Sequence, residues 1–233
     1  MSIVLKLEVL LTKLNVMKKK VLFSVVFALM GLMGMAQDLK DLYPAGAEAV
    51  ITPLPFDCAK GTPYSNPVPI DGAKVKGLPF YSYRDLNGTL KNTNEESFAS
   101  VFRHFRLPQG NNMEIVVVAI ERFEYMRYVM LAFKNGSLTD CLEAGFCSND
   151  DIAMKQWRIN EKGCIQISSL KLDDVAQQVL FKDDFGAVKA YRLDEIYEVD
   201  AEGKFKRFDK VEYDSREYTK EELMDKDRNI WSL

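Results

Sequence analysis

The stretch "YVMLAFKNGSLTD", Tyr128 to Asp140, carries the signal that decides the fold. A run rich in aromatic and aliphatic residues leads into Asn135-Gly136, and a second run begins directly after it. Glycine readily adopts the positive φ that a two-residue hairpin turn requires, and asparagine tolerates it. The stretch therefore predicts two antiparallel strands joined by a tight turn.

The same pattern recurs along the chain in "YSYRDLNGTLKN" (81–92), "KQWRINEKGCIQI" (155–167) and "EIYEVDAEGKFKRF" (195–208). Repeated hairpin signals of this kind predict an antiparallel meander. The run from Ile115 to Ile120 is apolar at consecutive positions, which is typical of a strand covered on both faces. We therefore expect a mainly β (α+β) fold, in which the meander forms a curled sheet, a sandwich or a barrel.

One segment predicts an amphipathic helix near residues 94–106. The sequence "TNEESFASVFRHFRLP" (93–108) spaces four apolar residues at i, i+3, i+4 and i+7, namely Phe98, Val101, Phe102 and Phe105. This stripe is expected to pack in the core. His104 would then lie on the exposed, polar side of the helix.

A short polar helix is predicted near the end of the chain, because Thr219 and Glu222 have the spacing of a capping box. The segment "LDDVAQQVLF" (172–181) fits either a helix or a strand.

The beginning of the chain has the layout of a secretory signal peptide. Three lysines, Lys18 to Lys20, precede an apolar run from Val21 to Met35, and small residues surround the expected cleavage point after Ala36. The run of about 15 residues is shorter than the roughly 20 that span a bilayer. We expect residues 1–36 to be removed, with Met17 as the favoured start. The mature protein would be exported to the periplasm or the cell exterior and would contain no membrane span.

The expected mature chain divides into a Pro-rich extended arm (37–79) and a single antiparallel β domain (80–233). The sequence has 31 basic and 34 acidic residues, and the leader holds five of the basic and one of the acidic residues, so the remainder carries a net charge of −7. An acidic surface repels phosphate groups, which argues against nucleic acid and anionic membranes as partners.

Four cysteines remain after the leader, at positions 58, 141, 147 and 164. In an exported protein an even number of cysteines favours disulfides. We expect a local bridge between Cys141 and Cys147 in "CLEAGFC", and a second bridge in which Cys58 and Cys164 attach the Pro-rich arm to the sheet. Free buried cysteines are the alternative.

The sequence predicts no catalytic residue, cofactor or metal ligand. It contains one histidine, His104, and lacks an HExxH pattern, a GxSxG elbow and a glycine-rich phosphate loop. Neighbouring acids occur as Asp150-Asp151, Asp173-Asp174, Asp183-Asp184 and Asp194-Glu195. Adjacent residues of a strand point to opposite faces, so such pairs are not expected to converge in space.

Four aromatic residues in predicted strands are candidates for a surface that stacks on a sugar or peptide: Tyr125, Tyr128, Trp157 and Tyr191. Packing in the core or between strands is the alternative interpretation. The functional hypothesis is a non-catalytic extracytoplasmic binding module for a glycan, a peptide or an envelope protein. The alternative hypothesis is a secreted hydrolase that uses carboxylates without a known motif.

The lysine-rich leader ending in Gly34-Met35-Ala36-Gln37, together with "FKNGSLTDCL" (133–142) and "YEVDAEGKFKRF" (197–208), resembles the uncharacterised exported β-rich proteins of Bacteroidetes. The resemblance covers the leader and residues 123–213. It implies a periplasmic or secreted setting, with no established activity and no catalytic residues.

Overall fold

The computed structural model describes residues 38–59, 68–70, 82–84, 90–92, 98–110, 112–122, 125–148, 152, 154–173, 185–224, 229–231 and 233. These residues belong to one compact unit that runs from Gln37 to Leu233. Several predicted features lie outside the described residues: the signal peptide (1–36), the Asn87-Gly88 turn, the acids Asp150, Asp151, Asp174, Asp183 and Asp184, and segment 174–181.

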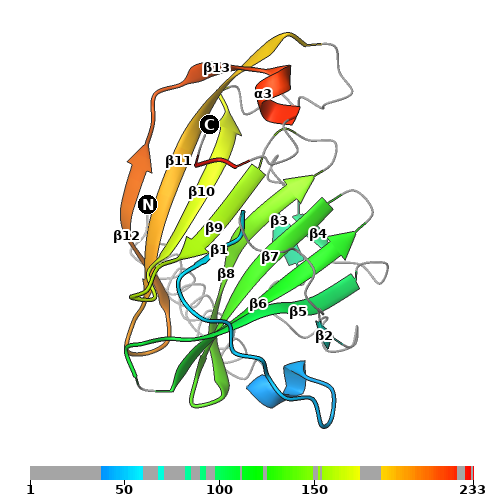
Figure 1. Ribbon diagram of the computed structural model, residues 1–233, viewed down its shortest axis with the longest axis vertical. Helices are drawn as coiled ribbons and strands as arrows, with labels where there is room; N and C mark the ends of the chain where they lie inside the picture. Colours follow the sequence, from blue (N-terminus) through cyan, green and yellow to red (C-terminus); the bar gives the residue numbers. More distant parts are fainter. Residues whose placement is uncertain are drawn as a thin grey trace, which may run out of the picture. The chain divides into compact units, whose positions relative to one another are not determined.

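The fold is an antiparallel sheet of 11 strands whose two ends do not meet (Figure 1). Its main path is a meander in which consecutive strands are neighbours: β5 (Phe98–Arg106), β6 (Met113–Arg122), β7 (Tyr125–Lys134), β8 (Ser137–Ser148), β9 (Met154–Ile159), β10 (Ile165–Leu172), β11 (Ala187–Val199) and β12 (Phe205–Glu212). The mainly β, curled-sheet prediction is therefore confirmed.

Shorter elements complete this sheet and its surroundings. β1 (Phe56–Asp57) pairs with β9, β2 (Val68–Pro69) pairs with β5, and β13 (Arg216–Thr219) pairs with β11. β3 (Ser82–Arg84) and β4 (Leu90–Asn92) form a separate two-stranded sheet, and the helical elements are η1 (Leu39–Leu42) and α3 (Lys220–Met224). None of the described helices is long and apolar enough to cross a membrane.

The predicted turns have the expected backbone geometry. Between β7 and β8, Asn135 has φ 52° and Gly136 has φ 81°. Gly163 in the β9–β10 turn and Gly203 in the β11–β12 turn have φ of 81° and 82°. β3 and β4 pair with each other on either side of the predicted Asn87-Gly88 turn. This pairing confirms the hairpin, although its turn residues are not described.

Strand β6 is buried on both faces, as its run of consecutive apolar residues predicted. Val116, Val118 and Ile120 belong to a first core cluster, which also contains Leu42 and Tyr43 from the N-terminal segment. Ile115, Val117 and Ala119 belong to a second cluster on the opposite face, with Phe102, Phe105 and Trp157. A third cluster lies around Leu170, Leu223 and Ile230.

The helix expected near residues 94–106 is wrong, because residues 98–106 form strand β5. A β-bulge at Phe102 explains the misleading spacing, since the register with β6 shifts between Val101 and Arg103. The extra residue changes the phase of side-chain alternation. Val101 therefore packs in the first cluster, whereas Phe102 and Phe105 pack in the second, a spacing that resembles a helical stripe.

The predicted disulfides are also wrong. Cys141 and Cys147 lie six residues apart on the single strand β8, which places them roughly 20 Å apart, whereas a disulfide needs Cα atoms within about 7 Å. Cys58 lies beside Trp157, whose backbone N–H points at its Sγ at 3.1 Å, while Cys164 sits in the β9–β10 turn. No disulfide joins these four cysteines, all of which are described.

The capping box predicted at Thr219 and Glu222 has the expected geometry. The Thr219 N–H donates to Glu222 Oε2 at 2.7 Å, and the Glu222 N–H donates to Thr219 Oγ1 at 3.2 Å. This reciprocal pair starts the short helix α3 and orients it so that Leu223 is buried in the third cluster.

Gly145 on β8 tests how tightly the second cluster is packed. A Cβ atom at this position would lie 2.7 Å from Tyr128 Cδ2 and 3.1 Å from Trp157 Cδ1. We expect Gly145→Ala to lower the free energy of unfolding by about 1–3 kcal/mol in urea denaturation, because both rings would have to move. Gly186→Ala is the control, since no atom lies within 4 Å of its Cβ position. Equal effects of the two substitutions would contradict this packing.

Candidate functional site

A hollow of about 420 Å³ opens at the end of the sheet where the β5–β6 and β7–β8 turns lie together. Among the described residues, its lining includes Arg106, Asn112, Glu114, Asn135 and Gly136. The Asn135 N–H donates to the Asn112 carbonyl at 3.1 Å, and Asn112 Nδ2 donates to Asn135 Oδ1 at 3.3 Å. These bonds tie the two turns together, and the volume falls within the range of small-molecule sites.

His104 is only 2% exposed and lies against Glu114, one of the lining residues. Tyr43 Oη and His104 Nδ1 are 2.8 Å apart. Burial raises the pKa of Tyr43 to about 12, with a further contribution from Glu114, so the phenol stays protonated and donates this bond. The imidazole proton is then on Nε2, which faces Glu114 Oε2 at 3.7 Å and has no hydrogen-bond partner.

Glu114 connects the buried histidine to the open side of the hollow. Its Oε1 accepts a bond from Arg106 Nη2 at 3.2 Å, and the exposed fractions of the two side chains are 15% and 67%. Burial lowers the pKa of His104, and the nearby Arg106 lowers it further, while Glu114 opposes the shift. The hollow therefore presents a carboxylate, a guanidinium and two amides, with hydrogen-bond donors and acceptors side by side.

The expectation that His104 is a surface residue is wrong. On β5 the bulge at Phe102 turns the His104 side chain toward Tyr43, on the face of the first core cluster. The Thr52 N–H also donates to the His104 carbonyl at 2.7 Å, so the N-terminal segment covers this part of the strand.

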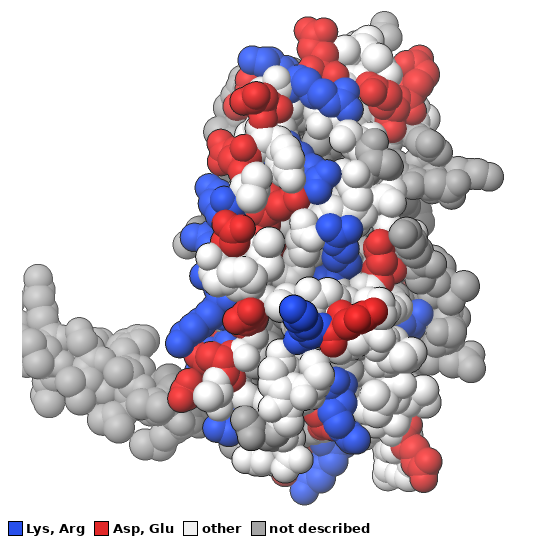
Figure 2. All heavy atoms as spheres, turned by 60° about the vertical axis from the view of Figure 1, so that its left-hand side comes forward, with Lys and Arg blue, Asp and Glu red and all other residues white. Residues whose placement is uncertain are grey.

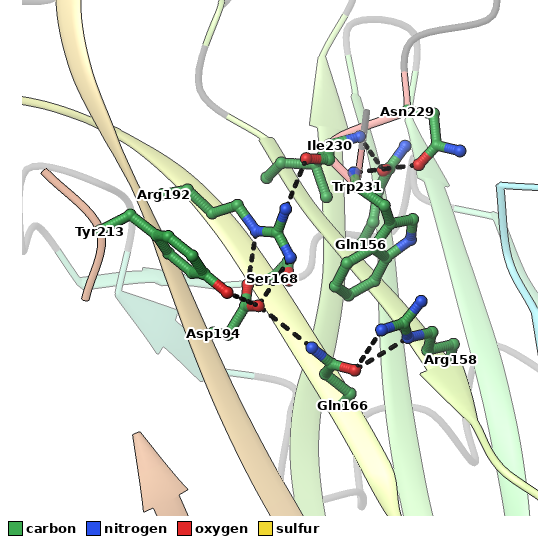
Figure 3. Close-up of polar contacts among 10 residues, drawn as sticks. All are labelled: Gln156, Arg158, Gln166, Ser168, Arg192, Asp194, Tyr213, Asn229, Ile230 and Trp231. Atoms are coloured by element: carbon green, nitrogen blue, oxygen red, sulfur yellow. Dashed lines mark hydrogen bonds and ion pairs between the residues drawn. The ribbon is translucent and has the colours of Figure 1, made fainter. Parts of the chain in front are cut away.

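A second polar cluster lies on the β9, β10 and β11 strands (Figure 3). Asp194, 2% exposed, accepts bonds from Arg192 Nε and Nη2 at 2.8 and 2.7 Å. Ser168 Oγ, Gln166 Nε2 and Tyr213 Oη also donate to it. Burial by itself would raise the pKa of the Asp194 carboxyl, but the bonds from Arg192 and Ser168 hold it below its usual range. With its lone pairs occupied in this way, Asp194 organises the sheet and does not act as a base.

The adjacent acid, Glu195, pairs with Arg207 instead of approaching Asp194. This agrees with the expectation that neighbouring acids on a strand do not converge. Among the described residues, no group of three or more His, Cys, Asp and Glu side chains is arranged to hold a metal ion.

Of the four predicted aromatic residues, Trp157 does not reach the surface. Trp157 is fully buried in the second cluster, where its ring centroid lies 6.3 Å from that of Tyr128. Tyr191 lies on β11, opposite Lys171 of β10, and Tyr125 begins β7 opposite Ser148. Trp157 is therefore a core residue, which agrees with the alternative interpretation.

The charged surface also lacks an extended area of one sign on the described part of the face in Figure 2, where basic and acidic side chains are interspersed. Pairs on β11, β12 and the turn between them contribute to this pattern: Lys206–Asp200, Arg207–Glu195 and Lys210–Glu212.

Sequence reasoning missed the residues of the hollow. Asn135 was recognised only as a turn residue, and nothing in the local sequence connects it with Asn112 or Glu114. The sequence signal is the pairing of glycine and asparagine at 110 and 112 and at 135 and 136, residue types that tolerate the positive φ found at all four positions.

No family model matches this sequence, and no curated protein or solved structure is significantly similar to it. The functional assignment therefore rests on the geometry of the chain itself.

The buried His104 is expected to make stability depend on pH. The pKa of His104 is lowered in the folded state. Below about pH 6.5 the histidine therefore binds a proton in the unfolded chain but stays neutral in the folded chain until a lower pH. The free energy of unfolding should fall as the pH drops below 6.5, by up to about 1.4 kcal/mol per pH unit, and should level off below the folded pKa.

Urea unfolding at several pH values measures this dependence. The matched variant is His104→Asn, which offers Tyr43 an oxygen acceptor but does not titrate. It should be less stable than the wild type at pH 7.5 and should lack the slope between pH 6.5 and 5.5. An unchanged slope in the variant would show that other groups cause the loss.

Proposed function

We propose that this protein is an exported, non-catalytic binding module that holds one sugar unit of a glycan in the hollow beside His104. The observation that carries the proposal is the lining itself. A carboxylate, a guanidinium and two amides converge on a space of about 420 Å³.

Sugar hydroxyl groups suit such a lining because each one both donates and accepts hydrogen bonds. Glu114 offers acceptor oxygens, Arg106 offers N–H donors, and the side chains of Asn112 and Asn135 offer both kinds of group. Since Arg106 and Glu114 neutralise each other, the hollow favours an uncharged polar ligand over an ion. The bonds between the two turns hold these groups in place before binding, which reduces the entropy cost of association.

The alternative proposal is a carboxylate-dependent hydrolase. Glycoside hydrolysis uses two carboxyl groups roughly 5–10 Å apart on either side of the bond that breaks. The carboxylate that lines this hollow, Glu114, lies beside Arg106, His104 and Tyr43, and none of these three neighbours is a second carboxyl group. This arrangement supports binding better than hydrolysis.

Binding can be measured by calorimetry or ligand-observed NMR with the methyl glycosides of glucose, galactose and mannose. We expect saturable binding of at least one glycoside. Arg106→Ala and Glu114→Ala should each weaken it by at least about tenfold, because a hydrogen bond to a charged group contributes about 1.5–3 kcal/mol. Arg207→Ala is the control, since it also removes a partly exposed arginine paired with a glutamate, Glu195. The proposal fails if no glycoside saturates the wild type, or if both hollow variants bind like the control.

The export part of the proposal rests on the leader sequence at residues 17–36. When the full chain is expressed in a bacterial host, the mature protein recovered from the periplasm or medium should begin at Gln37. N-terminal sequencing of each cell fraction measures this. Protein that stays in the cytoplasm with Met1 or Met17 at its start would contradict it.

A further inference from the structure

Arg158 on β9 lies at the edge of the Asp194 cluster (Figure 3) and is held in an unusual environment. Its Nε and Nη2 both donate to Gln166 Oε1, at 2.8 and 2.6 Å. One edge of the guanidinium is therefore bound to a neutral oxygen, which leaves its positive charge uncompensated by this contact.

The orientation of Gln166 follows from Asp194. Gln166 Nε2 donates to Asp194 Oδ2 at 3.1 Å, and a carboxylate can only accept such a bond. The amide oxygen of Gln166 must then point the other way, toward Arg158. The chain from Asp194 through Gln166 to Arg158 fixes the guanidinium in one rotational position.

Trp231 covers one face of this guanidinium. The Arg158 Cζ atom lies 4.2 Å from the centroid of the Trp231 ring, within the range of a cation–π contact. The C-terminal segment that carries Trp231 is anchored, because Ile230 is fully buried in the third cluster and its N–H donates to Gln156 Oε1 at 2.8 Å. The tryptophan is therefore a fixed wall of the site.

The other edge of Arg158 is open. Its Nη1 group and the second N–H of Nη2 have no hydrogen-bond partner in the described part of the chain. Nη1 is not one of the buried nitrogen atoms without a partner, so it is accessible to solvent. Asp57 lies opposite Arg158 in the register of β1 and β9, but its Oδ1 accepts a bond from the Ala59 N–H and no ion pair forms with Arg158.

We propose that Arg158 and Trp231 form a binding site for a single carboxylate group of a ligand. A guanidinium edge with two parallel N–H donors matches the two oxygens of a carboxylate. The pre-oriented guanidinium and the aromatic wall reduce what has to be ordered on binding. Arg192 already balances Asp194, and Asp57 lies opposite Arg158 in the register, so the surroundings add no excess positive charge and a monoanion fits better than a phosphate dianion. This site is independent of the sugar site beside His104.

The test uses the full mature chain and three probes: acetyl-Ala-Ala with a free carboxylate, the same dipeptide as its amide, and glucuronate. Binding is followed by the NMR resonance of the Arg158 Nε–H group and by tryptophan fluorescence. Because the chain has two tryptophans, the Trp231→Phe variant shows which of them causes the fluorescence change. We expect saturable binding of a carboxylate probe, and at least tenfold weaker binding of the amide. A response to the dipeptide alone indicates a peptide terminus, and one to glucuronate alone indicates an acidic sugar.

Two arginine variants separate geometry from charge. Arg158→Ala should abolish binding, and Arg158→Lys should weaken it several-fold because lysine lacks the planar pair of donors. Arg216→Ala is the control, because Arg216 also stacks on an aromatic ring, that of Tyr218, but is already paired with Glu222. Equal affinity for the carboxylate and the amide, an unchanged affinity in Arg158→Ala, or no binding of either carboxylate probe by the wild type would overturn the proposal.

Discussion

The structure depends on covering both faces of strand β6. Its residues from Ile115 to Ile120 are almost completely buried, so each face needs an apolar layer of its own. Leu42 and Tyr43 cover one face, whereas Leu54 and Phe56 pack against the cluster on the other. The N-terminal segment therefore passes from one side of the sheet to the other, and its Thr52 N–H pairs with β5 at His104 on the way. Residues 38–59 of the Pro-rich arm, which the structure describes, are therefore a structural part of the core.

The bulge in β5 links this core to the candidate site. One extra residue at Phe102 sends Phe102 and Phe105 into the aromatic group around Trp157, and it sends His104 to the opposite face. In that position the imidazole lies between Tyr43 and Glu114. A polar ring buried against an apolar layer is costly unless it is hydrogen-bonded, and here only one of its two nitrogens is satisfied. The bulge thus creates both the tight packing and the unsatisfied atom behind the hollow.

The polar groups of the sheet differ in how far the fold uses them. Asp194 is surrounded by donors, and its network joins β10 and β11 to the residues that follow β12. Arg158, at the end of the same network, is oriented by it but keeps one edge open. Polar groups that the fold holds in place, but whose hydrogen-bonding capacity it does not use up, remain available to a ligand. The polar groups around the hollow beside Glu114 are also held in place in this way. Both sites rest on strands and tight turns, so their geometry is set before any ligand arrives.

The sequence by itself determined the class of fold, the positions of the hairpin turns, the double burial of β6 and the capping of α3. Each of these depends on interactions between residues close in the chain, or on the two-residue alternation of a strand. Only the tertiary structure decided that residues 98–106 form a strand, because a bulge is defined by pairing with β6 and its local spacing resembles a helix. The same holds for Cys141 and Cys147, whose separation depends on β8 being one extended strand. The hollow and the Arg158 site combine residues from different strands and turns, and such convergence is fixed by register and packing between segments far apart in the sequence.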